Sequence, residues 1–263
     1  MIYFLLPAYN EEVALPLVLK AISSLEFTDE KWLVVVVDDG STDGTPEILR
    51  DWSDRIPLNV LIHSPNQGLG RAMRTGLEFL GGVLTDGDAV VALDSDNTHD
   101  PSLAVRMRRE QKENELDIVI ASRYFRGGGD DRGREIGLTY RRKILSRVAS
   151  FLLGLVFHLR GARDYTCGFR LYSGRILRVG REVYGERLVE EPNFVCMAEL
   201  LVKLARLGAR IGEVPLTLRY DLKGGASKLR MPQTILRYLR LIWRYKVLGE
   251  LRRFKLDSDR RER

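Results

Sequence analysis

The sequence predicts an α/β fold built on a mostly parallel sheet. Short apolar, β-branched runs alternate with longer segments of helical periodicity over the first half of the chain, which is the pattern of repeated strand–helix units. The run at 32–37 is Trp, Leu and four Val, as expected for a strand buried on both faces. With 263 residues and 44% hydrophobic content, the chain is long enough to bury a large core.

The elements are predicted in chain order. We expect strands at 2–6, 32–37, 59–62, 89–93, 116–121 and 211–218, and helices at 11–25, from 43, 68–80, from 101, 140–159, 193–207 and 232–249. Pro46 suits a first helical turn, and Pro101 opens the helix after the fourth strand. The polar, glycine-rich segment 127–137 predicts a mobile loop, and 223–228 predicts a second, basic one.

Composition restricts the partners and the compartment. The net charge is +6, and Lys and Arg concentrate in the second half, which suits a phosphate-bearing partner, an anionic membrane or nucleic acid. Cys167 and Cys196 form no repeated motif and are expected to be reduced core residues of a cytosolic protein. The N-terminus lacks a basic region and is expected to be a strand, not a signal peptide. No apolar run approaches the roughly 20 residues that span a bilayer, so any membrane contact is expected to be peripheral or through a partner.

An acidic pair ends the fourth predicted strand, in the stretch 90–101, VVALDSDNTHDP. Ligands of parallel sheets bind just past the carboxyl ends of the strands, and carboxylates as close as Asp94 and Asp96 repel unless a cation binds them. Oxygen ligands suit a hard divalent cation. The alternative is a loop whose Asp and Asn side chains only cap turns. His99 is either a ligand or base, or a cap for the next helix.

Polar clusters also follow the first two strands, at 7–11 and 37–45. No Gly-x-Gly-x-x-Gly follows the first strand, which argues against a nicotinamide cofactor. A glycine-rich basic phosphate loop is missing there too, which argues against a nucleotidyltransferase. Carboxylates accept hydrogen bonds from a nucleobase or ribose, so we expect these loops to bind a nucleoside and the acidic pair to bind its diphosphate through a metal.

Two later helices have contrasting faces. In 140–159 the apolar face holds Ile144, Val148, Phe151, Leu152, Leu155 and Leu159, and Arg142, Ser146 and Ser150 lie opposite. Such a face is ordinarily core. In 232–249, Arg237, Arg240 and Arg244 oppose Ile235, Tyr238, Leu239, Ile242 and Tyr245. This helix is expected to cover the core of the chain, to lie on an anionic membrane, or to dock on a partner.

These motifs together resemble the inverting family 2 glycosyltransferases, and within them the polyprenyl-phosphate branch typified by dolichyl-phosphate mannose synthases. The resemblance is carried by PAYNE at 7–11, VVDDGSTDGT at 36–45, NQGLG at 66–70, the Asp-x-Asp with His99 and Pro101, ASRY at 121–124, DYTCGFR at 164–170, EVP at 213–215 and GASK at 225–228. It implies the GT-A fold at 1–230, followed by a basic helix and charged tail at 231–263.

The resemblance also implies roles for particular residues. The nucleoside would be held by Pro7, Tyr9, Glu11, Val37 and Asp39. Asp94 and Asp96 would hold Mg²⁺ or Mn²⁺ on the diphosphate of the sugar nucleotide, and Ser95 would lie against the nucleotide. Arg123, Arg142 and Ser146 match positions that grip the lipid phosphate. A lipid acceptor needs an apolar surface beside its phosphate site, and the apolar face of 140–159 would offer one. Arg123 is also counted with the donor site, and Lys223 and Lys228 match the clamp on the donor diphosphate. Two departures stand out. Thr98 replaces a frequent Gln, and Lys223 replaces the usual Arg, giving a point charge in place of a bidentate fork.

The resulting hypothesis is metal-dependent, inverting transfer of a hexose, most simply mannose from GDP-mannose, to a polyprenyl phosphate at the cytosolic membrane face. A family 2 enzyme with a UDP-glucose or UDP-GlcNAc type of donor, or with a non-lipid acceptor and Glu190 or Glu191 as base, is the first alternative. A non-catalytic basic module binding membrane or nucleic acid is the second. It leaves the three polar strand ends unexplained, so no nucleic-acid partner is expected.

Overall fold

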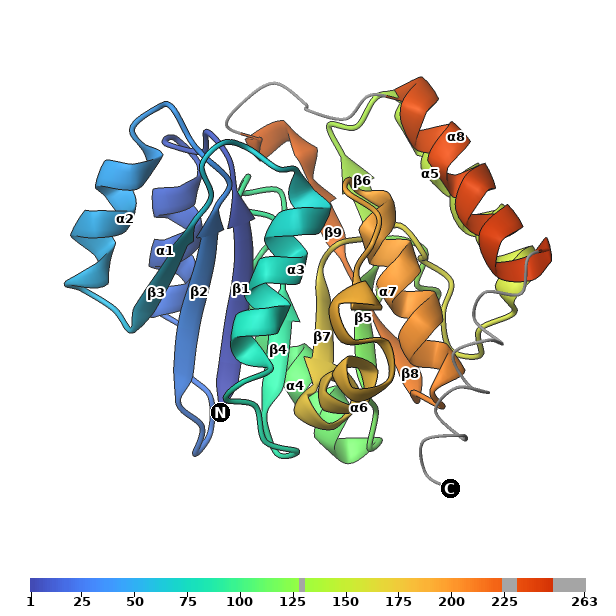
Figure 1. Ribbon diagram of the computed structural model, residues 1–263, viewed down its shortest axis with the longest axis horizontal. Coiled ribbons are helices and arrows are strands. Elements are labelled where there is room, and N and C mark those ends of the chain that lie inside the picture. The colour runs from blue at the N-terminus through green and yellow to red at the C-terminus, as the bar shows by residue number, and fades with distance from the viewer. Residues whose placement is uncertain (128–130, 224–230, 248–263) are drawn as a thin grey trace.

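A seven-stranded sheet runs through the molecule (Figure 1). The computed structural model describes residues 1–127, 131–223 and 231–247. The sheet order is β3 (Leu58–Ile62), β2 (Trp32–Asp38), β1 (Ile2–Ala8), β4 (Ala89–Ala92), β7 (Arg170–Ser173), β5 (Ile118–Ser122) and β8 (Ile211–Pro215). Every pairing is parallel except those of β7 with β4 and β5. The predicted mostly parallel α/β sheet is therefore confirmed.

Helices cover both faces of the sheet. They are α1 (Leu15–Ser23), α2 (Thr45–Ser53), α3 (Leu69–Leu80), α4 (Leu103–Glu113), α5 (Tyr140–Phe157), α6 (Gly174–Tyr184), η1 (Gly185–Leu188), α7 (Val195–Arg206), η2 (Tyr220–Leu222), α8 (Met231–Ile242) and η3 (Trp243–Val247). In Figure 1, α3, α6 and α7 lie in front of the sheet and α1 behind it. Helices α5 and α8 lie side by side at the right edge.

The core follows from the strand composition. Val34, Val35, Val36 and Val37 of β2 are fully buried, as expected where helices exclude water from both faces of a parallel sheet. A side chain at Gly76 of α3 would place its Cβ 2.2 Å from Leu5 of β1, so the glycine lets the helix pack closely on the sheet. Cys167 and Cys196 are buried and unpaired, as predicted.

Three predictions were incomplete in the second half. The expected loop 127–137 contains a strand, β6 (Arg134–Ile136), which pairs with β9 (Thr217–Arg219) in a second, two-stranded sheet. The single strand expected at 211–218 is divided between β8 and β9. Strand β7 was not predicted, because its first residue is the polar Arg170, which is unusual in a buried strand. Arg170 is fully buried and donates to the carbonyls of Met197 and Tyr165.

Helix α5 contradicts the core interpretation of its apolar face. Ile144, Val148, Phe151, Leu152 and Leu155 are all exposed. Leu159 is partly buried, and Ser150 on the polar face is buried. The cause is the polar surface beneath the helix, which is described below. Helix α8 and the following η3 also expose part of their apolar residues: Ile235, Leu236, Leu239 and Trp243 are exposed, whereas Tyr238, Leu241 and Tyr245 pack inward.

Some predictions fall on residues that the structure does not describe. Lys228, the boundary at residue 230 and the charged tail lie outside the described ranges. Within those ranges, no helix combines the length and the apolar character that crossing a bilayer requires. Peripheral contact with a membrane stays a prediction.

Candidate active site

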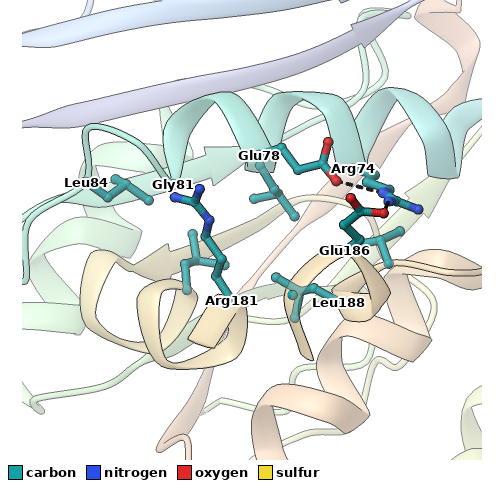
Figure 2. Close-up of a pocket in the computed structure, with 11 residues that line it drawn as sticks. Arg74, Glu78, Gly81, Leu84, Arg181, Glu186 and Leu188 are labelled. Atoms are coloured by element: carbon teal, nitrogen blue, oxygen red, sulfur yellow. Dashed lines mark hydrogen bonds and ion pairs between the residues drawn. The ribbon is translucent and has the colours of Figure 1, made fainter. Parts of the chain in front are cut away.

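A large cleft opens at the carboxyl ends of the parallel strands, with a volume of about 670 Å³. The residues that line it and were predicted as site residues are Pro7, Tyr9, Glu11, Asp39, Asp94, Ser95, Asp96, Arg123, Arg142, Ser146 and Lys223. A second cavity, between α3, α6 and η1, measures about 20 Å³ (Figure 2). Arg74 donates to Glu78 and Glu186 there. The space holds about one water molecule, so it is a small gap between packed helices and not a binding site.

The first two strand ends are joined by their own polar groups. Asn10 adopts a left-handed backbone (φ 52°), and its side chain accepts a hydrogen bond from the backbone N–H of Thr42 (2.8 Å). The backbone N–H of Glu11 donates to the Thr45 hydroxyl (2.9 Å). These contacts fix the loop after β1 against the loop after β2, and they place Tyr9 and Glu11 on the cleft wall.

Asp39 organises the floor of this side. Its carboxylate accepts the backbone N–H groups of Gln67 (2.9 Å) and Gly68 (2.7 Å), and it lies 2.7 Å from His63 Nδ1. The other ring nitrogen of His63 lies 2.9 Å from the Thr75 hydroxyl of α3. Asp39 therefore holds the loop 66–68 in place as well as facing the cleft. Val37, the other residue predicted on this strand end, is fully buried in β2 and is not part of the described cleft wall.

The acidic pair lies at the centre of the cleft. Asn97 is left-handed (φ 63°), a conformation that Asn tolerates better than most residues, and the turn brings the Thr98 side chain back to Asp96. The Thr98 hydroxyl donates to Asp96 Oδ1 at 2.6 Å. Thr98 thus orients one carboxylate. Ser95 donates to the carbonyl of Pro7 (2.8 Å), which ties the pair to the end of β1.

The two carboxylates have opposite electrostatic environments. Burial raises the pKa of Asp94 above its ordinary value. Burial also opposes ionisation of Asp96, but the ammonium of Lys223 and the Thr98 hydroxyl outweigh it and lower the pKa of Asp96. Lys223 forms an ion pair with Asp96 Oδ2, and this partner raises the pKa of Lys223 despite its burial. The cleft therefore balances its acidic centre with its own cation.

The acidic centre fits a divalent cation that gains further ligands from a substrate. Among the described residues no hydrogen bond reaches the Asp94 carboxylate, and the buried Nδ1 of the adjacent His99 has no partner. Helix α4 has no side-chain hydrogen bond at its N-cap, Ser102, so His99 does not cap it, and Asp100 accepts the backbone N–H of Ser102 (2.9 Å) in the turn before the helix. The described residues contain no group of three or more His, Cys, Asp or Glu arranged for a metal. Two protein carboxylates would leave coordination positions for diphosphate and water.

A cluster of hydroxyls lies under α5 on the other side of the cleft. Tyr124 donates to Ser146 (3.0 Å), and Thr166 lies 3.1 Å from Ser146 and 3.4 Å from Ser150. Burial raises the pKa of Tyr124 to about 12, so its hydroxyl keeps the proton it donates. These bonds turn the polar face of α5 inward and leave its apolar face in solvent.

Arg123 anchors that cluster. Its guanidinium forms a bidentate pair with the fully buried Asp164 (2.8 and 2.7 Å) and donates to Thr166 (2.6 Å). Although burial opposes its charge, Asp164 raises the pKa of Arg123 well above the ordinary value. Arg123 therefore enters the cleft as a fixed cation with most of its donors engaged.

Arg142 is held differently. Its guanidinium lies 5.4 Å from the centroid of the Tyr220 ring and donates to the Tyr220 hydroxyl. Tyr220, Thr166 and Tyr238 line the cleft but were not predicted as site residues. Tyr220 lies between the last strand and the glycine-rich basic loop, and that position was the available signal for it.

The carboxylates considered as a possible base are both paired. Glu190 forms ion pairs with Lys203 (2.9 Å) and Arg187 (3.1 Å). Glu191 lies 3.3 Å from Arg237 of α8 and 3.7 Å from Arg244 of η3. These contacts attach the basic side of α8 to the body of the protein, and neither carboxylate lines the described cleft.

Comparison with known families decides the classification. The sequence profile described as glycosyl transferase family 2 matches residues 3–179, which include both upstream strand ends, the acidic pair and Arg123. The chain belongs to glycosyl transferase family 2.

Curated relatives of this family 2 chain fall into two groups. It is 30% identical to an undecaprenyl-phosphate mannosyltransferase of Micrococcus luteus over 86% of each chain. It is 29% identical to a dolichyl-phosphate β-glucosyltransferase of Trichomonas vaginalis over 80% of this chain, but the match spans only 62% of that relative. A second such glucosyltransferase from the same organism is 30% identical and is matched over 52% of its length.

Solved structures share the fold of this family 2 chain. Glucosyl-3-phosphoglycerate synthase from Mycobacterium tuberculosis, in complex with Mn²⁺, UDP-glucose and phosphoglyceric acid, aligns with a TM-score of 0.62 at 22% identity, over 92% of this chain and 78% of that one. S. aureus TarS in complex with UDP-GlcNAc aligns with a TM-score of 0.58 at 19% identity, over 92% of this chain and 65% of that one. The fold is GT-A, as the resemblance implied.

Proposed function

We propose that this family 2 enzyme transfers a hexose from a sugar nucleotide to a polyprenyl phosphate, with inversion, at a membrane surface. One observation carries the proposal. A single cleft is lined by the acidic pair and by the inward polar face of α5, while the outward face of the same helix is apolar. Donor and acceptor phosphates would meet beside a surface suited to lipid.

The donor side would bind the nucleoside and its diphosphate. Tyr9, Glu11 and Asp39 lie on the wall formed by the first two strand ends, and Asp94 and Asp96 lie next to them. Lys223, and by resemblance Lys228, would contact the diphosphate. Breaking the anomeric C–O bond builds negative charge on the departing diphosphate, which a nearby fixed ammonium stabilises without proton transfer.

The metal proposed for this site is Mg²⁺ or Mn²⁺, held by Asp94 and Asp96. It would supply Lewis-acid stabilisation of the leaving diphosphate. Thr98 keeps the Asp96 carboxylate oriented, and the partnerless Nδ1 of His99 offers a further polar atom at the same place. Binding a cation there would also remove the cost of ionising the buried Asp94.

The acceptor phosphate would be positioned by Arg142, Ser146 and Arg123. With a second pKa of about 6, a phosphate monoester is already mostly dianionic at neutral pH, so it needs orientation more than a general base. Ser146 lies within the hydroxyl cluster, and Arg142 faces the cleft from the first turn of α5. This arrangement fits the pairing of Glu190 and Glu191 with cations, which leaves neither as a free base.

The surface formed by the exposed apolar residues of α5 and α8, here the α5–α8 surface, is proposed to lie on a lipid bilayer. Phe151 is 69% exposed and Leu236 is 68% exposed, and both helices also line the cleft that would hold the lipid phosphate. Transfer of such apolar side chains from water to the boundary of the bilayer lowers their free energy. We place this membrane contact at the cytosolic face, either on lipid alone or with a separate membrane subunit.

The hexose is proposed to be mannose from GDP-mannose, and glucose from UDP-glucose is the second candidate. Both proposals are supported by relatives, since those found include an undecaprenyl-phosphate mannosyltransferase and dolichyl-phosphate glucosyltransferases. Purified enzyme would be incubated with each labelled donor, dolichyl or undecaprenyl phosphate, and Mn²⁺ or Mg²⁺. A lipid-linked β-hexosyl phosphate formed with one donor, and abolished by EDTA, is the expected product.

Two results would contradict this function. Absence of a lipid-linked product from any common sugar nucleotide, with product formed on a water-soluble acceptor, would favour a family 2 enzyme with a non-lipid acceptor. Salt-sensitive binding to nucleic acid without sugar-nucleotide affinity would favour a basic binding module. Full activity in EDTA would contradict the proposed role of the metal but not the proposed transfer reaction.

A further inference from the structure

Tyr220 lies where the donor and acceptor sides of the cleft meet. It opens η2 directly after β9, which pairs in parallel with β6. The backbone N–H of Arg219 donates to the carbonyl of Thr98 (3.0 Å), so this segment is also fastened to the loop that carries Asp96. The backbone thus holds Tyr220 in place from two directions.

The ring of Tyr220 lies near one cation of the donor side of the cleft and one cation of the acceptor side. Lys223 Nζ lies 5.5 Å from its centroid, and the guanidinium carbon of Arg142 lies 5.4 Å from it. Arg142 also donates to the Tyr220 hydroxyl. Both distances fall within the range of cation–π attraction. The contacts of the ring and of the hydroxyl can therefore be separated by mutation, because the hydroxyl binds Arg142 alone, whereas the ring lies near both cations.

Two like charges on one ring repel each other unless an anion offsets them. Lys223 has the Asp96 carboxylate as its counter-ion. Arg142 forms no ion pair with a carboxylate in the part of the chain that the structure describes. An anion that enters between donor and acceptor sides would satisfy Arg142, and a diphosphate beside Asp96 would engage Lys223.

We propose that Tyr220 is a positioning residue that presents Lys223 to the donor diphosphate and Arg142 to the acceptor phosphate from one rigid support. The inference rests on the proposed transfer to a phosphate acceptor. It extends that function by assigning the alignment of the two substrates to a residue that contacts neither acidic ligand of the proposed metal. The Tyr220 hydroxyl would fix the position of Arg142, and the Tyr220 ring would support both Arg142 and Lys223.

Paired substitutions separate the two contacts. Tyr220→Phe removes the hydroxyl that accepts from Arg142 but keeps the ring, so the KM for the acceptor should rise about tenfold and the KM for the donor should change less than about twofold. Tyr220→Leu removes the ring too, so the KM for the donor should also rise, by about fivefold. Donor affinity without acceptor, measured by calorimetry, should fall in Tyr220→Leu and not in Tyr220→Phe.

A matched control is Tyr184→Phe, since the Tyr184 ring also faces a lysine, Lys203 (5.5 Å), but lies outside the cleft. It should change neither KM. The inference is overturned if Tyr220→Phe leaves the acceptor KM unchanged, or if both Tyr220 variants raise both KM values equally, as a general loss of structure would. Failure of the proposed function is distinct, because then the wild-type enzyme forms no lipid-linked product.

Discussion

The two sides of the cleft that are proposed to bind the donor and the acceptor, here the donor side and the acceptor side, use polar residues in opposite ways. On the donor side, polar side chains follow buried strands and bind neighbouring backbone groups, as Asp39 binds the N–H groups of Gln67 and Gly68. On the acceptor side, helix α5 turns Ser146 and Ser150 inward and leaves Phe151 in solvent. One side has an apolar interior below its polar loops, whereas the other buries hydroxyl groups beside Leu153 and Phe157 of α5 and exposes apolar residues on the outer face of that helix.

The difference teaches how a binding site affects the surface around it. A nucleoside diphosphate is polar throughout, so loops at a sheet edge are sufficient to bind it. A polyprenyl phosphate has a charged head and an apolar tail, so the element that binds its head should also present an apolar face beside it. Helix α5 has this property, and the hydroxyls of Tyr124 and Thr166 stabilise its unusual orientation.

The largest effect is expected from Asp96→Ala at the boundary between the sides. Turnover should fall about 100-fold or more, because the change removes a proposed metal ligand and the counter-ion of Lys223. Radiolabelled product formation measures turnover, and circular dichroism checks that the fold is intact. Retained turnover in this variant would argue against the metal role and against a shared catalytic boundary.

Asp39→Asn tests the donor side alone. The amide presents an N–H group toward backbone donors that now bind a carboxylate, so the loop at Gln67 and Gly68 should shift and the KM for the sugar nucleotide should rise about tenfold. The KM for the lipid acceptor should stay the same. If the acceptor KM rises as much, then the two sides are not independent and the comparison fails.

Leu239→Glu tests the apolar exterior of the acceptor side. Leu239 is 52% exposed in α8. Val83, in the turn after α3, has the same exposure and supplies the control Val83→Glu. Binding to anionic phospholipid vesicles in a flotation assay should fall about tenfold for Leu239→Glu and not for Val83→Glu. Equal binding of both variants to the vesicles would contradict the proposal that the α5–α8 surface lies on a membrane.

The smallest effect on activity, none, is expected for Glu30→Gln, which changes stability only. Burial opposes ionisation of Glu30, but Arg108 and Lys112 hold its pKa at about 2. Since that is below the unfolded value of about 4.3, the stabilisation is complete above the unfolded pKa and is lost as pH falls through about 2.

Thermal unfolding of the Glu30 variant should therefore depend on pH. At pH 7 the free energy of unfolding of the wild type should exceed that of Glu30→Gln by about 1–2 kcal/mol. This difference should shrink as the pH falls from 5 to 3. A difference that is constant over this range would mean that the charge of Glu30 is not what stabilises the loop before β2. Reduced turnover at pH 7 would show that the ion pair influences the cleft.

Sequence patterns predicted the donor side well because its elements are local. A buried strand needs consecutive apolar residues, as in Val34–Val37, and the end of such a run is marked by a carboxylate, Asp38 in β2 and Asp94 after β4. The acceptor side was harder. Arg170 starts a buried strand, and its two terminal guanidinium nitrogens donate to the carbonyls of Met197 and Tyr165. Residues Arg134–Ile136 form a strand because β9 pairs with them.

The sequence by itself determined the α/β class, the family and the carboxylates at the strand ends, because strand periodicity and motif spacing are properties of neighbouring residues. Tertiary structure alone decided which face of α5 is inside, that Thr98 orients Asp96, and that Tyr220 joins Arg142 to Lys223. Helical periodicity identifies two faces but not which one a protein buries. That choice depends on the hydrogen-bond partners that the rest of the fold presents to the helix.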